Sequence, residues 1–131
     1  MPNSRTEAGL PQRTEVLIIG AGMSGLAMGR QLKRAGVRDF LIAERAEGPG
    51  GVWRANAYPG AACDVPSHLY SYSFFPNPDW SRKFAPQAEI KAYFERASAE
   101  FGLEPHIRYG KSVRALTYEE AEGVWRIEFE H

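Results

Sequence analysis

The feature that most constrains this chain is a short apolar run that leads directly into a ladder of glycines. The run is Val16 to Ile19, and the spacing G-x-G-x-x-G-x-x-x-G follows it as Gly20, Gly22, Gly25 and Gly29. This order predicts a buried strand, a tight turn and a helix. Gly20 permits the sharp turn, and Gly22 lets a ligand approach the backbone. Gly25 and Gly29 let the helix lie close to the strand.

The ligand that fits such a turn is a dinucleotide. Its pyrophosphate would lie at the amino end of the helix, where free N–H groups and roughly half a positive charge favour an anion. Ser24 adds a hydroxyl donor there. A second apolar run, Phe40 to Ala43, predicts another strand, and Glu44 follows it, 19 residues after Gly25. An acid there accepts hydrogen bonds from a ribose and repels a 2′-phosphate, which favours FAD or NAD over NADP. The alternative is a plain βαβ unit with a surface glutamate.

Length and composition narrow the remaining possibilities. The 131 residues suffice for one domain of ordinary size. Sixteen basic and sixteen acidic side chains balance, so neither nucleic acid nor an anionic membrane is an expected partner. The apolar runs are too short to span a membrane. Cys63 is the only cysteine, which excludes an internal disulfide and a cysteine metal cluster, leaves no metal site expected, and suits a reducing cytoplasm.

The amino-terminal segment, residues 1–14, is polar, contains two prolines and lacks a hydrophobic centre. It does not have the pattern of a secretory signal and is interpreted as a flexible lead-in. The folded domain is expected over residues 15–131.

A segment rich in glycine and proline, Glu47 to Trp53, follows the second strand. This composition predicts a loop and argues against helix or inner strand. Its glycines, including Gly51, allow a second close approach of the backbone to a ligand. Trp53 either shields a planar ring or fills the core, and the sequence leaves both readings open.

The next stretch, Asn56 to Pro78, is long, aromatic and irregular, and loops of this length inside a compact domain tend to be functional. Pro59-Gly60 predicts a type II turn. Asp64 lies among apolar and aromatic residues, where a carboxylate needs a partner or a purpose; the alternative is a turn or capping residue. His68 and Cys63 are interpreted as packing residues, not as a base or a nucleophile.

The carboxyl-terminal half predicts one helix and three short strands. Ala85 to Glu89 opens the helix with a proline near its first turn, and Gly102 ends it. The helix carries an apolar stripe at three- and four-residue spacing: Ile90, Tyr93, Phe94, Ala97 and Phe101. Ile107 to Tyr109 predicts a strand, and Ser112 to Tyr118 with Val124 to Phe129 predicts a hairpin.

Taken in order, these motifs resemble the N-terminal part of flavin-dependent (class B) monooxygenases of the Baeyer-Villiger type. The resemblance extends from Val16 to Phe129. The glycine ladder with its acid occurs in many flavoproteins, whereas the later motifs form a much narrower signature. They are Gly50-Gly51-Val52-Trp53, Tyr58 to Ser67, Tyr70 to Phe74, Pro78-Asp79-Trp80-Ser81 and Ala85-Pro86-Gln87.

The resemblance implies an α/β, Rossmann-like FAD/NAD(P)-binding fold of three layers, with a parallel sheet and a β-hairpin or meander layer, incomplete in this chain. It also implies an enzyme in which NADPH reduces FAD, the reduced flavin captures O2 as a peroxyflavin, and one oxygen atom is inserted into a ketone. The partners would be a small-molecule substrate and O2.

The resemblance assigns a role to individual positions. Asp64 corresponds to the acid beside the isoalloxazine, which acts with an arginine from a later domain and is the catalytic candidate. The cofactor-binding positions are Gly20, Gly22, Ser24 and Gly25 at the pyrophosphate, Glu44 at the ribose, Val113 at the adenine, and Gly51, Val52, Trp53, Asp64 and Tyr70 at the flavin.

Some parts of the family pattern are absent. Many relatives carry arginine where this chain has Ala62. The second glycine motif for NADPH, the family's F-x-G-x-x-x-H-x-x-x fingerprint and the arginine partner of Asp64 would all lie after His131, so we expect a fragment. Two alternatives remain open: part of an N- or S-oxygenating flavin monooxygenase, or a dinucleotide-binding module without catalytic activity.

Overall fold

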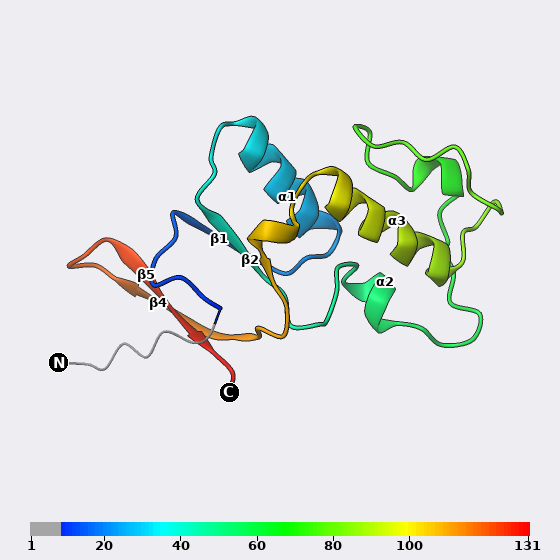
Figure 1. Cartoon of the computed structure of the whole chain (residues 1–131). Coiled ribbons are helices and arrows are strands. Elements are labelled where there is room, and N and C mark those ends of the chain that lie inside the picture. Colours follow the sequence, from blue (N-terminus) through cyan, green and yellow to red (C-terminus); the bar gives the residue numbers. More distant parts are fainter. Residues whose placement is uncertain (1–8) are drawn as a thin grey trace.

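The structure, a computed structural model, describes residues 9–131 (Figure 1). Its centre is a parallel sheet of β1 (Val16–Ile19), β2 (Phe40–Ala43) and β3 (Ile107–Arg108), in the order β1-β2-β3. Val16 pairs with Phe40, and Ile42 pairs with Ile107. All four residues of β2 are buried, because this central strand has a neighbour on each edge and helices over it. Most of the predicted lead-in, residues 1–8, lies outside the described residues.

Two long helices pack in this half of the molecule: α1 (Met23–Arg34) lies against β1 and β2, and α3 (Gln87–Glu100) lies beside α1. A short 3-10 turn, η2 (Glu104–His106), connects α3 to β3. The core between them includes side chains that are less than 2% exposed: Leu26, Ile42, Ile90, Tyr93, Phe94 and Leu103. A Cβ built on Gly29 would lie 3.0 Å from Leu103 Cδ2 and 3.2 Å from Ile42 Cδ1, so the glycine lets α1 lie close to β2 and to Leu103, not to β1.

The remaining elements lie on either side of this core. The hairpin of β4 (Val113–Glu119) and β5 (Val124–Phe129) is antiparallel and lies away from α1 and α3 (Figure 1). None of its residues is buried. The one-turn helix α2 (Val52–Ala55) and the 3-10 turn η1 (Ser67–Leu69) belong to the irregular half near α3.

The structure confirms most of the expected elements and corrects three details. The segment Glu47 to Trp53 is predicted to contain no helix, and this is wrong for its last two residues, Val52 and Trp53, which belong to α2. The Pro59-Gly60 turn is present, with Gly60 at φ 85° and a hydrogen bond from Ala61 N to Tyr58 O. His68 is exposed and does not pack, whereas Cys63 is 5% exposed and lies in the core, as expected. The stripe on α3 is buried as far as Ala97, and Phe101 is only half-buried.

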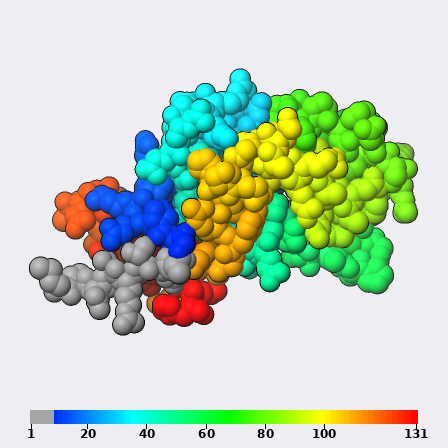
Figure 2. All heavy atoms as spheres, viewed as in Figure 1, coloured from blue at the N-terminus to red at the C-terminus, as the bar shows by residue number. Residues whose placement is uncertain are grey.

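The first described residues lie against the last strand of the sheet. Arg108 Nε donates to the carbonyl of Gly9 at 2.6 Å. In Figure 2 this segment appears as dark blue atoms beside the orange ones. Within residues 9–131, no helix combines the length and apolarity needed to cross a bilayer.

Candidate functional site

The glycine turn between β1 and α1 has the geometry that its spacing predicts. Gly20 has φ 97°, a conformation that favours glycine, and its N–H donates to Ala43 O at 2.8 Å. A Cβ on Gly25 would lie 1.8 Å from the carbonyl oxygen of Gly20. No side chain fits there, so both glycines are required by the protein's own backbone.

Gly22 differs, because nothing in the described structure requires it to be glycine. Its φ is −85°, and an added Cβ would meet its nearest atom, Gly51 Cα, at an ordinary 3.5 Å. The space that a side chain would fill opens at the amino end of α1. A ligand that approaches the backbone closely is the remaining reason for glycine at this position.

The amino end of α1 presents backbone donors. The first helical bond joins Leu26 N to Gly22 O, and the first turn has neither a side-chain cap nor an acidic residue. Ser24 is exposed. Four backbone N–H groups before Leu26 have no acceptor within residues 9–131. They are those of Gly22, Met23, Ser24 and Gly25. Such a group of unpaired donors, together with the helix dipole, favours an anion.

Glu44 lies directly behind the turn. Its side chain is buried, with 5% of the residue exposed, so the reading as a surface glutamate is wrong. Oε2 accepts from Ala21 N at 2.6 Å, and Oε1 accepts from Ala46 N at 2.8 Å. Each carboxylate oxygen can accept more than one hydrogen bond, so acceptor capacity remains for a ribose hydroxyl.

The second glycine loop, Gly48 to Gly51, packs against the glycine turn that begins at Gly20. Gly50 N donates to Ala21 O at 3.0 Å, and a Cβ on Gly51 would lie 3.1 Å from Gly22 Cα. Gly50 and Gly51 have φ of 128° and 55°, in the range that favours glycine. The two loops thus form one backbone surface beside the amino end of α1.

An aromatic pair extends this surface. Trp53 Nε1 donates to the Tyr70 hydroxyl at 2.7 Å, and the rings meet edge to face with centroids 5.7 Å apart. Burial raises the pKa of Tyr70, the hydrogen bond from Trp53 lowers it, and the nearby Cys63 and Asp64 raise it further. Both rings are half-buried, while Val52 is 65% exposed. Trp53 therefore packs against the core, as one of the two readings expects. Its accessible side leaves the other reading, shielding of a planar ring, as a prediction.

Asp64 is exposed, contrary to the expectation of apolar surroundings. Its carboxylate makes no hydrogen bond or ion pair with any of residues 9–131, so it does not cap a turn or helix there. Its charge acts on Tyr70. The structure thus gives Asp64 no structural role in the described part of the chain.

Val113 lies at the other end of the surface. It begins β4, two residues after Lys111, whose N–H donates to the carbonyl of Glu44 at 2.9 Å. The structure therefore brings the start of the hairpin to the strand end that carries the ribose candidate.

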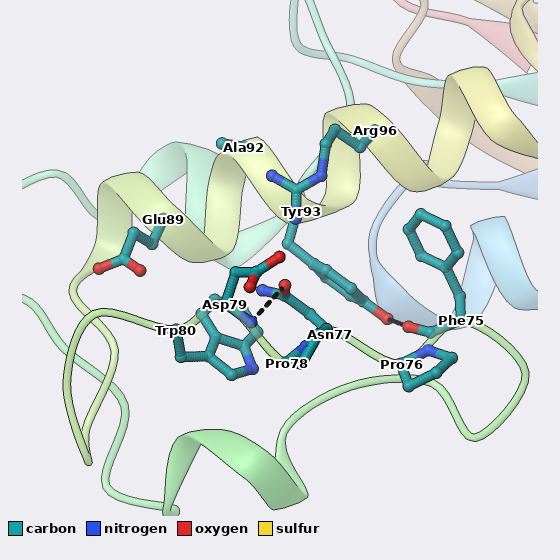
Figure 3. Close-up of a pocket in the computed structure, with 10 residues that line it drawn as sticks. All are labelled: Phe75, Pro76, Asn77, Pro78, Asp79, Trp80, Glu89, Ala92, Tyr93 and Arg96. Carbon is teal, nitrogen blue, oxygen red and sulfur yellow. Dashed lines mark hydrogen bonds between the residues drawn. The ribbon is translucent and has the colours of Figure 1, made fainter.

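Two hollows lie near these elements. A small one of about 150 Å3 is lined by Val52, Trp53, Asn56, Tyr58, Ala61 and Ala62 and adjoins the flavin candidates. The larger one, about 430 Å3, lies between residues 75–80 and α3 (Figure 3). It contains none of the predicted site residues, so its size does not identify the site. Within the described residues, no cluster of three or more histidine, cysteine or acidic side chains could hold a metal ion.

The sequence reading missed two side chains that hold α2. Gln87 Nε2 donates to the carbonyl of Trp53 at 2.5 Å. Arg54 donates to Pro49 O at 2.8 Å through Nε and to Glu95 at 2.6 Å through Nη2. Gln87 belongs to a signature motif, which was a usable signal. Arg54 had none, because its partners are set by tertiary placement.

Comparison with known proteins identifies the relatives. The profile of the NAD(P)-binding Rossmann-like domain matches residues 18–86. A Baeyer-Villiger monooxygenase of Streptomyces coelicolor is 47% identical over 117 residues, covering 89% of this chain and 22% of the relative. A Baeyer-Villiger monooxygenase of Pseudomonas aeruginosa is 45% identical over 113 residues, covering 86% and 21%. The chain thus spans little more than a fifth of the length of these relatives.

Solved structures agree with this relationship. A steroid monooxygenase bound to NADP superposes with a TM-score of 0.82 and 37% identity, covering 89% of this chain and 23% of that one. Cyclohexanone monooxygenase from Rhodococcus sp. Phi1, bound to NADP+, superposes with a TM-score of 0.84 and 33% identity. The match covers 92% of this chain and 24% of that one. The predicted Rossmann-like fold and the resemblance are confirmed. The chain belongs to the NAD(P)-binding Rossmann-like domain family, and its relatives are Baeyer-Villiger monooxygenases.

Proposed function

We propose that this chain is the FAD-binding part of an NADPH-dependent flavoprotein monooxygenase that oxidises ketones by Baeyer-Villiger insertion. The observation that carries the proposal is the surface at Gly22. An anion-binding helix end, a glycine that only a ligand explains, and a buried acid at the adjacent strand end lie together there. This is the arrangement that a dinucleotide needs.

The residues fit FAD in three parts. The pyrophosphate would accept from the unpaired N–H groups at the start of α1, and Ser24 would add its hydroxyl. Glu44 would use its remaining lone pairs for the ribose hydroxyls, and Val113 would border the adenine. The flavin would lie beside Gly51, Val52 and the pair of Trp53 and Tyr70.

FAD rather than NADP fits this site because the acid at the ribose is buried and its charge is held by two backbone N–H groups. A 2′-phosphate beside that carboxylate would meet like charge. The relatives solved with NADP therefore imply a separate site for NADPH.

When bound, the flavin would supply the electron transfer and the activation of O2. The chain's own residues would bind and orient it. Asp64 has an exposed carboxylate that is unpaired within residues 9–131 and close enough to influence Tyr70. It could therefore hold a cationic group at the flavin edge and keep that group protonated. Trp53 and Tyr70 would cover one side of the ring and restrict water.

Two alternatives are less well supported. Oxygenation of nitrogen or sulfur would use the same FAD half, but the relatives from Streptomyces coelicolor and Pseudomonas aeruginosa are Baeyer-Villiger monooxygenases. A non-catalytic dinucleotide-binding module would not need an exposed carboxylate near Tyr70.

A titration of the purified 131-residue chain tests the cofactor assignment. FAD should quench its tryptophan fluorescence saturably, NADP+ should bind more weakly, and Gly22→Val should abolish the FAD response. Equal responses to FAD and NADP+, or FAD binding that survives Gly22→Val, would contradict the proposal.

A further inference from the structure

Arg54 makes an unusual set of contacts for a side chain with no predicted role. Its Nε donates to the carbonyl of Pro49 at 2.8 Å, and its Nη2 lies 2.6 Å from Glu95 Oε1 on α3. The side chain is 24% exposed, and that of Glu95 is 45% exposed. One guanidinium therefore joins the second glycine loop to the long helix.

Gly48 provides an independent sign that this placement is built into the loop. A Cβ on Gly48 would lie 2.3 Å from Arg54 Nη2 and 2.4 Å from Cζ. The φ of Gly48 is outside the range that requires glycine, so its backbone alone does not demand the residue. The missing side chain at Gly48 is the space that the guanidinium occupies.

The loop that Arg54 holds continues directly to the glycine turn. Pro49 precedes Gly50, whose N–H donates to Ala21 O, and Gly51 packs against Gly22 at the amino end of α1. A displacement of the loop would therefore open or close the space at Gly22. The line of contacts runs from Glu95 through Arg54 to the proposed pyrophosphate site.

We propose that Arg54 is a positioning residue that fixes the distance between the second glycine loop and the proposed dinucleotide site at Gly22. It does so with two different hydrogen bonds from one planar group, to Pro49 O and to Glu95. Lysine cannot reproduce this arrangement, because its ammonium is a single point of charge. The part of the inference that concerns FAD rests on the function proposed above.

Amide hydrogen exchange, followed by NMR in the 131-residue chain without cofactor, tests the positioning role directly. In Arg54→Lys the Gly50 N–H should exchange about tenfold faster, the change expected for loss of one charge-assisted hydrogen bond. The amides of β2 should keep their parental exchange rates. Glu95→Gln should have a smaller effect, because the bond to Pro49 O remains.

The matched control is Arg126→Lys. Arg126 forms a comparable pair with Glu119 at 3.0 Å, but on the exposed hairpin. It should leave Gly50 exchange unchanged. A Gly50 exchange rate in Arg54→Lys within about twofold of the parent would show that the positioning role is wrong. So would an increase in the Gly50 rate no larger than the increase in the rates of the β2 amides.

A second measurement separates this inference from the proposed function. FAD titration of Arg54→Lys should give an affinity several-fold weaker than the parent. Failure of the parent to bind FAD would overturn the proposed function alone, since the exchange result still decides the role of Arg54. FAD binding equal in parent and Arg54→Lys would overturn the inference alone.

Discussion

The carboxylate of Glu44 accepts a hydrogen bond of 2.6 Å from the backbone N–H of Ala21, which lies 23 residues earlier in the chain. This bond joins the carboxyl end of β2 to the glycine turn. A second bond, from Ala46 N, holds the other oxygen. Glu44, which we propose binds the ribose, therefore also holds the backbone of the turn in place.

Replacing Glu44 should affect both stability and cofactor binding. Glu44→Ala leaves two backbone N–H groups without their acceptor, which should lower the free energy of unfolding by about 1–3 kcal/mol in the absence of FAD. FAD affinity should fall roughly tenfold or more, since 1.4 kcal/mol corresponds to a factor of ten. Urea unfolding and FAD titration measure the two effects. Glu47→Ala, at an exposed position, is the control. Unchanged FAD affinity in Glu44→Ala would confine the residue to its structural role.

The glycines of the turn should respond differently to the same substitution. Gly25→Ala should unfold or severely destabilise the chain, because its Cβ would lie 1.8 Å from the carbonyl oxygen of Gly20. Gly22→Ala should fold with nearly parental stability and bind FAD much more weakly, because its Cβ meets only an ordinary contact at 3.5 Å. Circular dichroism, thermal unfolding and FAD titration distinguish them. Tight FAD binding by Gly22→Ala would remove the argument for a ligand at this position.

Asp64 should matter for chemistry and not for folding. Its carboxylate is exposed and has no hydrogen-bond partner within residues 9–131, so Asp64→Ala should change the free energy of unfolding by less than about 0.5 kcal/mol. In a protein that carries the remaining length of its relatives, the variant should retain FAD but slow flavin reduction by NADPH or the oxygenation that follows. Stopped-flow absorbance measures both steps. Parental turnover of a ketone would show that Asp64 has no role in either.

Alkaline pH should destabilise the chain through its tyrosines. Burial is the main cause that raises the pKa of Tyr70, Tyr72, Tyr93 and Tyr109 above the usual value of 10.0. A raised pKa means that the fold favours the protonated hydroxyl. This stabilisation is complete below the unfolded pKa and is lost as pH rises through the folded values. Urea unfolding should thus give a free energy that declines above about pH 10. A free energy that is constant up to pH 11.5 would contradict the attribution.

The 131-residue chain should not catalyse ketone oxygenation when FAD and NADPH are added. It contains a single G-x-G-x-x-G, and the proposed flavin surface is open at Val52. Oxygen activated there would leave as hydrogen peroxide instead of meeting a ketone. NADPH consumption, peroxide release and ester formation are the measurements. Coupled, ketone-dependent turnover would show that this account of the site is incomplete.

The sequence predicts the glycine turn well because its determinants are local. The positive φ of Gly20 and the close packing of Gly25 follow from the spacing of the glycines alone. The strand before the turn and the acid after β2 are also encoded by short, regular patterns. The start of α3 at Gln87 and its end before Gly102 agree for the same reason.

The parts that could not be predicted depend on contacts between distant segments. The turn of helix at Val52 arises in a run whose glycines and proline indicate loop, and Arg54 and Gln87 hold it against α3. Glu44 could be assigned to a ribose from its position, but its bond to Ala21 N appears only once the turn has folded back. The exposure of Asp64 likewise depends on how its irregular segment is placed.

The hairpin of β4 and β5 has no buried residue, although the tilted rings of Tyr118 and Trp125 meet across its strands with centroids 5.2 Å apart. A two-stranded unit of this kind is marginal by itself in water. Its amides should therefore exchange through local opening long before the parallel sheet unfolds. Because Val113 begins this hairpin, binding of an adenine there would have to order an element that is marginal by itself. Part of the intrinsic affinity would be spent on that ordering, so a cross-link that closes the hairpin should tighten FAD binding without touching the ligand.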